Sequence, residues 1–474
     1  MERSRPPELT GTLECETGPV SVQVLKASPH TLFVRFPEGN PPAHRAELRN
    51  FVLRVGDREF ALGRSRYHSH AENPARRKDD PPLLGDGKLA FLDDLYDFQV
   101  LMRTGTIQGF KKRLEQLPAL WGRKKDIRPA FREFVAELVY DLQVYRSLLD
   151  EVDRSLQEEP WAIRTDVHRV VTQSEYPGFC ALFDERLARL AEQVKDFSQE
   201  EHERHGFYLR KHAWDIIRSS EFLLRTNLKP RGYAGDSMMM RMLYENDFRG
   251  PTAFARFMHK HPVETAAAQA VRNRVGLLSE RIRALPRTRG RRTRFMSVAA
   301  GPAWELREVF QRPEDLEAYE VVLLDQDREA LNEATQMIQR LEKQLGGRMH
   351  YTLIQDSVRT MLRTPDLPGK WGRFSFVYSM GLFDYLTAPV ARVVLARLYD
   401  LLEPGGELVV GNFHVDSPTR LYMEYWMDWV LIYRTEAEFL ELSDGLKGAQ
   451  TSVFFEDTRC QMFLSVRKAG ETTS

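Results

Sequence analysis

From Arg294 onward the sequence alternates apolar runs of strand length with stretches of helical periodicity. The runs are RFMSVA, YEVVLLD, MHYTLIQ, RFSFVYS and GELVVGNF, and the helical stretches between them cover 303–312, 328–345 and 389–403. Successive strand–helix–strand units build a parallel sheet that helices cover on both faces. The tail adds TSVFFEDT and CQMFLSV, which predict a closing β-hairpin. Residues 286–474 are therefore expected to form a Rossmann-like α/β domain.

The N-terminal residues 1–70 have a different pattern. Short runs such as SVQVLKA, HTLFVRF, NFVLRVG and REFALG alternate apolar with polar residues and are interrupted by Gly, Pro and Asn. This pattern is typical of a small antiparallel barrel. Residues 71–87 are charged and rich in Pro and Gly, so we expect a linker there.

Residues 88–285 are expected to be helical. Apolar residues recur at spacings of three and four, which places a stripe on one face of each helix: Phe131, Val135, Leu138, Leu142, Tyr145, Leu149 and Val152, then Phe183, Leu187, Leu190, Val194 and Phe197. The segment NLKPRGYAGDSMMM (227–240) breaks this periodicity with Pro and Gly. We expect a helical cap over the α/β domain, with a loop at this segment.

Composition narrows the classes of function. A chain of 474 residues is long enough for two to four domains, and its 68 basic and 68 acidic residues leave no net charge to hold nucleic acid or anionic lipid. The three cysteines show no CxxC spacing, and the histidine pairs His202/His205 and His259/His261 have no partner motif, so no metal site is predicted. No run reaches the length of a membrane span, and a cytoplasmic protein is expected.

The residues after the predicted strands are the candidate site, because ligands of open α/β sheets bind outside the carboxyl ends of the strands. The first turn is Ala299-Ala300-Gly301-Pro302, whose small residues let a cofactor approach and whose following helix favours a carboxylate. Asp325, with Gln326 beside it, ends the second run and is placed to accept from ribose hydroxyls; Asp327 is the alternative. An ordinary strand-to-helix turn in which the Asp caps the next helix remains the other interpretation.

The next strand ends add further polar groups. Asp356 and Ser357 follow the third run and suit an exocyclic amine of a base, and Tyr378-Ser379 ends the fourth. His414 follows the fifth run, either lining an acceptor pocket or as a plain strand-end residue. The order small, acidic, acidic, polar-aromatic is more specific than any single member.

With these motifs, residues 294–467 resemble a class I S-adenosylmethionine-dependent methyltransferase domain. SVAAGPAWEL resembles its glycine-rich first motif, VVLLDQD its acidic second motif and LYDLLEPGGELVVGNF its strand-five signature. The resemblance implies that S-adenosylmethionine is the cofactor. It places the methionine part at Gly301 and its neighbours, the ribose at Asp325 and the adenine at Asp356. Ala299 and Ala303 stand where glycines are common in the family.

A narrower resemblance extends back to about residue 90. KPRGYAGDSMM, YSMGLFDYL and YMEYWMDWVLIYRT resemble bacterial methyltransferases of the extracellular-factor, 3-hydroxypalmitic acid methyl ester biosynthesis group. The carboxylate of a hydroxy fatty acid is therefore one candidate acceptor. The N-terminal strands weakly resemble a PilZ-type barrel, but the RxxxR that grips a cyclic dinucleotide is absent. We expect a degenerate module that mediates protein contacts or dimerisation.

The RGYAGD loop supplies the candidate catalytic residues. A carboxylate acceptor is already nucleophilic and needs a donor pair to orient it, whereas a hydroxyl or amine needs a base. Arg231 and Tyr233 are the expected pair, with Asp236 orienting Arg231 or acting as base; Tyr385, Tyr433 and Arg434 rank second. The loop is alternatively a tight turn in which Arg231 pairs with Asp236.

Two other functions stay open at this stage. A signalling or scaffold protein would sense the cofactor without catalysis, which the missing glycines favour and the retained Asp325 and Asp356 oppose. A nucleotide-dependent oxidoreductase is disfavoured because GxGxxG is absent.

Overall fold

The computed structural model describes residues 9–15, 18–36, 42–55, 58–69, 86–98, 100–101, 107–287 and 290–470. The chain divides into two compact units, Met1–Asp126 and Ile127–Ser474. Each unit has its own hydrophobic core.

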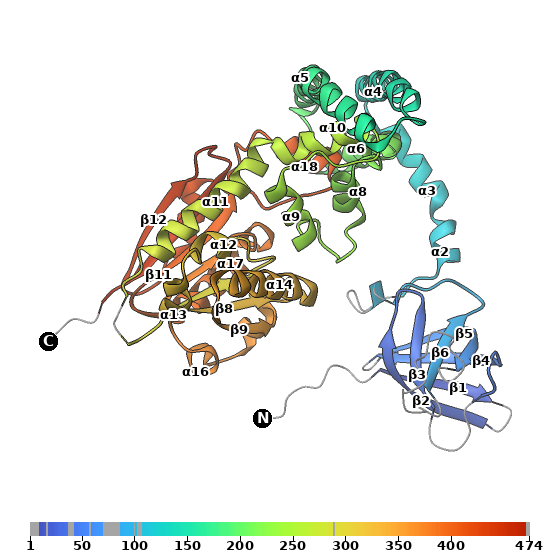
Figure 1. Cartoon of the computed structure of the whole chain (residues 1–474). Coiled ribbons are helices and arrows are strands. Elements are labelled where there is room, and N and C mark those ends of the chain that lie inside the picture. The colour runs from blue at the N-terminus through green and yellow to red at the C-terminus, as the bar shows by residue number, and fades with distance from the viewer. Residues whose placement is uncertain are drawn as a thin grey trace. The chain divides into compact units, whose positions relative to one another are not determined.

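The first unit is a closed six-stranded barrel (Figure 1) in the order β1-β2-β3-β6-β5-β4. Its strands are β1 Leu9–Cys15, β2 Gly18–Ala27, β3 Thr31–Arg35, β4 Glu47–Val55, β5 Arg58–Ser69 and β6 Asp86–Phe91. All its pairings are antiparallel, and alternate side chains such as Val22, Val34, Phe51 and Leu89 fill the interior. Short helices follow: α2 Phe110–Glu115, α3 Leu117–Gly122 and η2 Arg123–Asp126.

The barrel extends past its expected end at residue 70. Strand β6 pairs with both β3 and β5 and closes the barrel. The expected linker at 71–87 falls outside the described residues except for its last two, and these begin β6. The domain boundary expected between residues 87 and 88 was wrong, because the charged, Pro-rich stretch lies between two strands of one barrel, β5 and β6.

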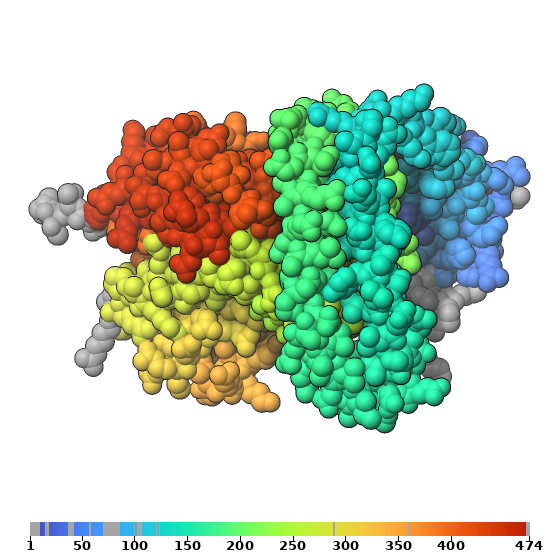
Figure 2. Space-filling view, turned by 90° about the horizontal axis from the view of Figure 1, so that it is seen from above, coloured from blue at the N-terminus to red at the C-terminus, as the bar shows by residue number. Residues whose placement is uncertain are grey.

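The helical region of the second unit confirms the two apolar stripes. Helices α4 Pro129–Ser155 and α5 Trp161–Val194 lie side by side (Figure 2) and bury Phe131, Leu138, Phe183 and Leu190. The remaining helices are α6 Gln199–His212, α7 Trp214–Ile217, α8 Glu221–Leu228, α9 Ser237–Glu245, α10 Ala253–Glu264 and α11 Ala266–Arg283. The expected loop appears between α8 and α9.

The C-terminal sheet has seven strands in the order β12-β13-β11-β10-β7-β8-β9. The strands are β7 Thr293–Val298, β8 Tyr319–Asp325, β9 His350–Gln355, β10 Phe374–Ser379, β11 Leu402–Phe413, β12 Ala449–Phe455 and β13 Gln461–Lys468. Strands β7 to β11 are parallel, and the expected hairpin β12–β13 joins β11 antiparallel. The chain leaves β7 toward β8 and returns on its other side as β10. Strand order therefore reverses between β7 and β10, where such sheets bind their ligands.

Two cores cover the two faces of the sheet. Alternate residues of β7 and β8 serve opposite faces, so that Phe295 and Val321 belong to one core and Met296 and Val322 to the other. The helices and turns around the sheet are α12 Leu306–Val309, α13 Pro313–Ala318, α14 Arg328–Leu345, α15 Val358–Arg363, α16 Leu367–Trp371, η3 Phe383–Tyr385, α17 Ala388–Asp400, α18 Arg420–Trp426, α19 Glu436–Leu440 and η4 Glu441–Ser443.

The helix expected over 303–312 is only one turn long. Helix α12 ends at Val309, and α13 begins at Pro313, since a proline favours the first position of a new helix. The polar groups after β7 therefore come from a loop and not from a long helix.

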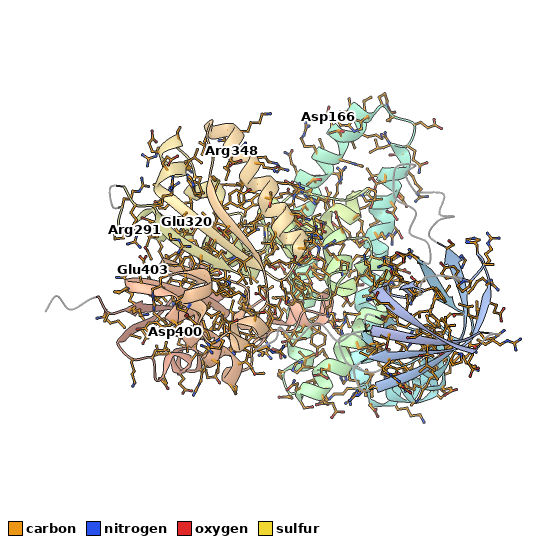
Figure 3. The ribbon with its side chains drawn as sticks, turned by 90° about the horizontal axis from the view of Figure 1, so that it is seen from below. Asp166, Arg291, Glu320, Arg348, Asp400 and Glu403 are labelled. Carbon is orange, nitrogen blue, oxygen red and sulfur yellow. The ribbon has the colours of Figure 1, made fainter. Side chains whose placement is uncertain are left out.

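The amino-terminal edge of the sheet, opposite the strand ends, carries paired surface charges. Arg291 pairs with Glu403 and Arg294 with Glu320, and Figure 3 labels three of these residues. In the described part of the chain no helix is long and apolar enough to cross a bilayer. The described residues also contain no cluster of three His, Cys, Asp or Glu side chains placed to hold a metal.

Candidate functional site

A cavity of about 340 Å³ opens at the carboxyl ends of β7, β8, β9 and β10, where strand order reverses. Eleven of the fourteen residues expected at the site line it: Tyr233, Ala299, Ala300, Gly301, Pro302, Asp325, Gln326, Asp356, Ser357, Tyr378 and Tyr385. Arg231, Asp236 and Ser379 do not.

The loop after β7 has an unusual backbone. Ala299, Gly301 and Ala303 have φ angles of 54°, 56° and 49°, in the left-handed region that glycine favours. The two alanines thus adopt a backbone conformation that side chains with a Cβ disfavour. A Cβ placed on Gly301 would meet no atom within 4 Å, so this residue faces open cavity.

Asp325 fastens this loop to the end of β8. Its Oδ2 accepts the Gly301 backbone N–H and its Oδ1 accepts the Asp327 N–H, both at 2.8 Å. The side chain is buried, and burial raises the pKa of Asp325 although these N–H groups favour its charged form. Asp325 therefore orders the loop as well as lining the cavity.

Asp356 lies at the end of β9. Its Oδ1 accepts the Ser357 N–H at 2.8 Å and its Oδ2 accepts from Lys370 Nζ at 3.2 Å. Partial burial raises the pKa of Asp356, but hydrogen bonds from Thr360, Ser357 and Lys370 outweigh it and leave that pKa below its usual value. Asp356 is an ionised acceptor at neutral pH.

Two residues at the end of β10 have separate roles. The Tyr378 hydroxyl donates to Glu305 Oε1 at 2.7 Å, and burial raises the pKa of Glu305, which also lines the cavity. Ser379 Oγ donates instead to the Val298 carbonyl oxygen at 2.8 Å and joins β10 to β7. Ser379 is thus a structural residue beside the site.

The RGYAGD loop lies against the N-terminus of α14. Arg231 pairs with Asp327 and Glu333, each at 3.0 Å, and the Tyr233 hydroxyl donates to Asp327 at 3.2 Å. Asp327 also caps α14 by accepting the Glu329 N–H. Arg231 therefore reaches the cavity only through the residues that it holds.

The expected pairing of Asp236 with Arg231 is wrong. Asp236 is fully buried, caps α9 by accepting the Met239 N–H at 3.0 Å, and binds Arg225 through both oxygens. The N-cap hydrogen bond and the two-point ion pair with Arg225 engage both carboxylate oxygens of Asp236.

The far end of the cavity, over β10 and β11, is aromatic. Trp429 Nε1 donates to the Tyr385 hydroxyl at 2.8 Å, and a Cβ added at Gly235 would come within 3.0 Å of Trp429 and 3.2 Å of Tyr385. A side chain at Gly235 would therefore press on both rings and require them to shift by a few tenths of an ångström. Phe413 and Leu431 complete the lining.

Asp384 is the acidic group of this end. It is buried, lines the cavity, and accepts the Phe413 N–H through Oδ1 at 2.7 Å. Burial raises the pKa of Asp384 to about 7, although this N–H and the charges of Arg274 and Arg434 favour its ionised form. Asp384 thus changes charge near neutral pH.

Arg274, on α11, is a buried cation in the cavity wall. Its guanidinium donates to the Met380 carbonyl oxygen, the Tyr244 hydroxyl and the Met240 sulfur, each at 3.3 Å. Tyr244 lines the cavity beside it and stacks on Trp304 with ring centroids 5.2 Å apart.

The structure does not bring the other candidates to the cavity. His414 pairs across to Arg434 in an isolated bridge, and Arg434 donates to backbone carbonyl oxygens of Phe383 and Leu386. The Tyr433 ring lies under Arg420. None of these three is among the cavity residues.

Sequence reasoning did not select Asp384, Glu305, Trp429, Tyr244 or Arg274. The first three stand inside motifs that it quoted, so their signal was present. Arg274 has no such signal in the sequence, because it is one of several arginines on α11 and only the packing shows which of them is buried.

Comparison with known proteins gives likenesses of structure alone. No known family profile matches the sequence, and no curated protein matches it significantly. A possible exported protein from Bordetella parapertussis is 20% identical with a TM-score of 0.42, over 63% of this chain and 97% of its own. An O-methyltransferase family protein from Burkholderia thailandensis is 14% identical with a TM-score of 0.35, over 68% and 98%. A magnesium protoporphyrin IX methyltransferase from Synechocystis, with bound S-adenosylhomocysteine, is 12% identical with a TM-score of 0.32, over 43% and 87%. Likenesses at this level assign no residue a role.

Proposed function

We propose that the protein is an S-adenosylmethionine-dependent methyltransferase that acts on a small or lipid-like acceptor. The observation that carries the proposal is the loop after β7, whose left-handed residues and tie to Asp325 open the cavity wall at the point where strand order reverses. A backbone held in this way lets a cofactor approach closely.

The cavity residues fit this cofactor. Asp325 and Asp356 follow the neighbouring strands β8 and β9 and offer acceptors for ribose hydroxyls and an exocyclic amine. The loop 299–303 lies over β7, and the aromatic end lies over β10 and β11. The four adjacent strands β8, β7, β10 and β11 span roughly 14 Å at the usual spacing between strands, enough for a nucleoside that carries a short chain.

In such a reaction the protein has to align the acceptor with the methyl group and to exclude water. When bound, the cofactor supplies a methyl group on a sulfonium, and transfer is an in-line displacement by the acceptor. Tyr385, Trp429, Phe413 and Leu431 wall the acceptor end with mostly apolar surface. This wall suits an acceptor with an apolar body, and a hydroxy fatty acid is one such molecule.

Titration calorimetry with S-adenosylhomocysteine tests the proposal, with NAD⁺ as the competing ligand that an oxidoreductase would take. We expect one binding site for S-adenosylhomocysteine and no heat with NAD⁺. Binding of NAD⁺ alone, or of neither ligand, would contradict the proposal.

A non-catalytic sensor would also bind the cofactor. Release of S-adenosylhomocysteine from S-adenosylmethionine in the presence of a hydroxy fatty acid separates the two functions. The alanines of the loop do not favour the sensor, because they adopt the left-handed backbone that glycine would allow. We further propose a cytoplasmic protein whose barrel mediates protein contacts.

A further inference from the structure

Arg274 is a buried charge without an ionic partner. No carboxylate of the described residues forms an ion pair with it, and its contacts are a carbonyl oxygen, a phenol and a thioether. Arg225 and Arg231, in the same region of the unit, each pair with a carboxylate. An uncompensated buried charge costs several kcal/mol, so a guanidinium kept in this state indicates a binding site for an anionic group.

The cavity is the side from which an anionic group can approach Arg274. Arg274 lines it, and the nearest acids of the wall, Glu305 and Asp384, act on the guanidinium only at longer range. Glu305 is engaged by Tyr378, and Asp384 by the Phe413 N–H. A ligand is therefore the group that can approach Arg274 directly.

Tyr244 supplies a second donor at the same place. Its hydroxyl lies 3.3 Å from Arg274 Nη2, and the stacked Trp304 fixes its ring. A guanidinium and a phenol side by side match the two oxygens of a carboxylate. This is the Arg-and-Tyr pair that the sequence suggested at Arg231 and Tyr233, but supplied by α9 and α11.

The position of the pair favours the acceptor over the cofactor. Arg274 contacts Met240, and the Met240 methyl carbon lies 3.6 Å from a Cβ built on Gly235, the residue packed between Tyr385 and Trp429. Arg274 also contacts the carbonyl oxygen of Met380, just past β10. The pair thus adjoins the aromatic end of the cavity.

We propose that Arg274 and Tyr244 bind the carboxylate of the acceptor and determine specificity for it. The inference rests on the proposed function. In the transfer step a carboxylate oxygen forms a bond to the methyl carbon as the carbon–sulfur bond breaks, and that electron pair stays on sulfur. No proton moves, and the ester product is neutral. Arg274 therefore loses its ionic partner when the reaction is complete, which favours release of the product.

The test is calorimetry of the full chain saturated with S-adenosylhomocysteine, using 3-hydroxydecanoate and its uncharged analogue 3-hydroxydecanamide as probes. We expect the acid to bind at least tenfold more tightly than the amide. Arg274→Gln should abolish this difference, and Tyr244→Phe, which keeps the ring on Trp304, should reduce it. Arg283→Gln, at an exposed position of the same helix, is the matched control and should leave it unchanged.

Three binding results would overturn the proposal. The wild-type protein binds neither probe, or it binds the two equally, or Arg274→Gln weakens S-adenosylhomocysteine more than tenfold and leaves 5′-methylthioadenosine unaffected. The last result would assign Arg274 to the carboxylate of the cofactor. Failure of the wild-type protein to bind S-adenosylhomocysteine at all is a separate result that contradicts the proposed function.

The melting temperature of the Arg274→Gln protein separates a ligand-binding role of Arg274 from a structural one. Removing an unpaired buried charge should raise the melting temperature of the ligand-free Arg274→Gln protein or leave it unchanged. A large fall would show that Arg274 is structural and would overturn the proposal.

Discussion

The backbone N–H of Gly301 donates to Oδ2 of Asp325 at 2.8 Å, and this bond joins the loop after β7 to the end of β8. The second oxygen of Asp325 accepts the Asp327 N–H, so one carboxylate holds two strand ends in place. The geometry of the loop thus depends on an acid that is also exposed to the cavity.

Replacing Asp325 should loosen the loop. Asp325→Ala removes both acceptors and leaves two N–H groups without them, at about 1–3 kcal/mol each. We expect affinity for S-adenosylhomocysteine to fall at least tenfold in calorimetry, with a lower free energy of unfolding. Asp325→Asn keeps one acceptor oxygen and should lie between; equal affinity of all three proteins would contradict this role.

The left-handed backbone of Ala299 and Ala303 predicts that glycine at these positions stabilises the folded protein. A residue with a Cβ in this conformation costs about 1–2 kcal/mol, part of which glycine returns through the entropy of the unfolded chain. Ala299→Gly should therefore raise the free energy of unfolding by up to about 1 kcal/mol in denaturant titrations, and Ala303→Gly should gain less because it also removes a fully buried methyl group. Ala300, which lies between them without a positive φ, is the control, and Ala300→Gly should destabilise the protein. Loss of stability in all three variants would refute the assignment.

Arg231 should act through the loop that it holds. Arg231→Gln breaks ion pairs with Asp327 and Glu333 and leaves these two acids unpaired. We expect a loss of about 1–3 kcal/mol in the free energy of unfolding together with weaker binding of S-adenosylhomocysteine. Abolished turnover with unchanged cofactor binding, the result expected for a residue that orients the acceptor, would show that Arg231 touches the acceptor.

Asp384 predicts a pH dependence of stability. Its pKa is raised to about 7 in the folded protein from a usual 3.8, so between these values the folded state binds more protons than the unfolded chain. The free energy of unfolding should therefore fall as pH rises from about 4 to 7. Asp384→Asn keeps an acceptor for the Phe413 N–H and removes the titration. Stability curves of the two proteins should diverge over this range, with the variant the more stable at pH 8; parallel curves would exclude a raised pKa.

The sheet and most of the cavity wall at the ends of β7, β8 and β9 could be predicted, because both depend on signals that are local in the sequence. Strand-length apolar runs and the small or acidic residues after them are adjacent in sequence, and Gly301, Asp325 and Asp356 line the cavity at the strand ends. The closing hairpin followed from alternation alone.

The aromatic end of the cavity could not be predicted because it depends on packing between distant segments. Arg274, Tyr244 and Trp429 come from three elements that meet only in the folded chain. The pairing of Asp236 with Arg231 was predicted wrongly for the same reason. Two arginines precede Asp236 nearby in the sequence, and the fold pairs it with Arg225. Strand β6 was missed because the charged stretch before it has the composition of an interdomain linker.

The most direct test of the account is a crystal structure of the complex with S-adenosylhomocysteine. We predict the ribose at Asp325, the adenine beside Asp356, and the sulfur facing the chamber formed by Tyr385, Trp429 and Arg274. A ligand bound outside this cavity, or one whose sulfur points away from that chamber, would contradict the proposed function.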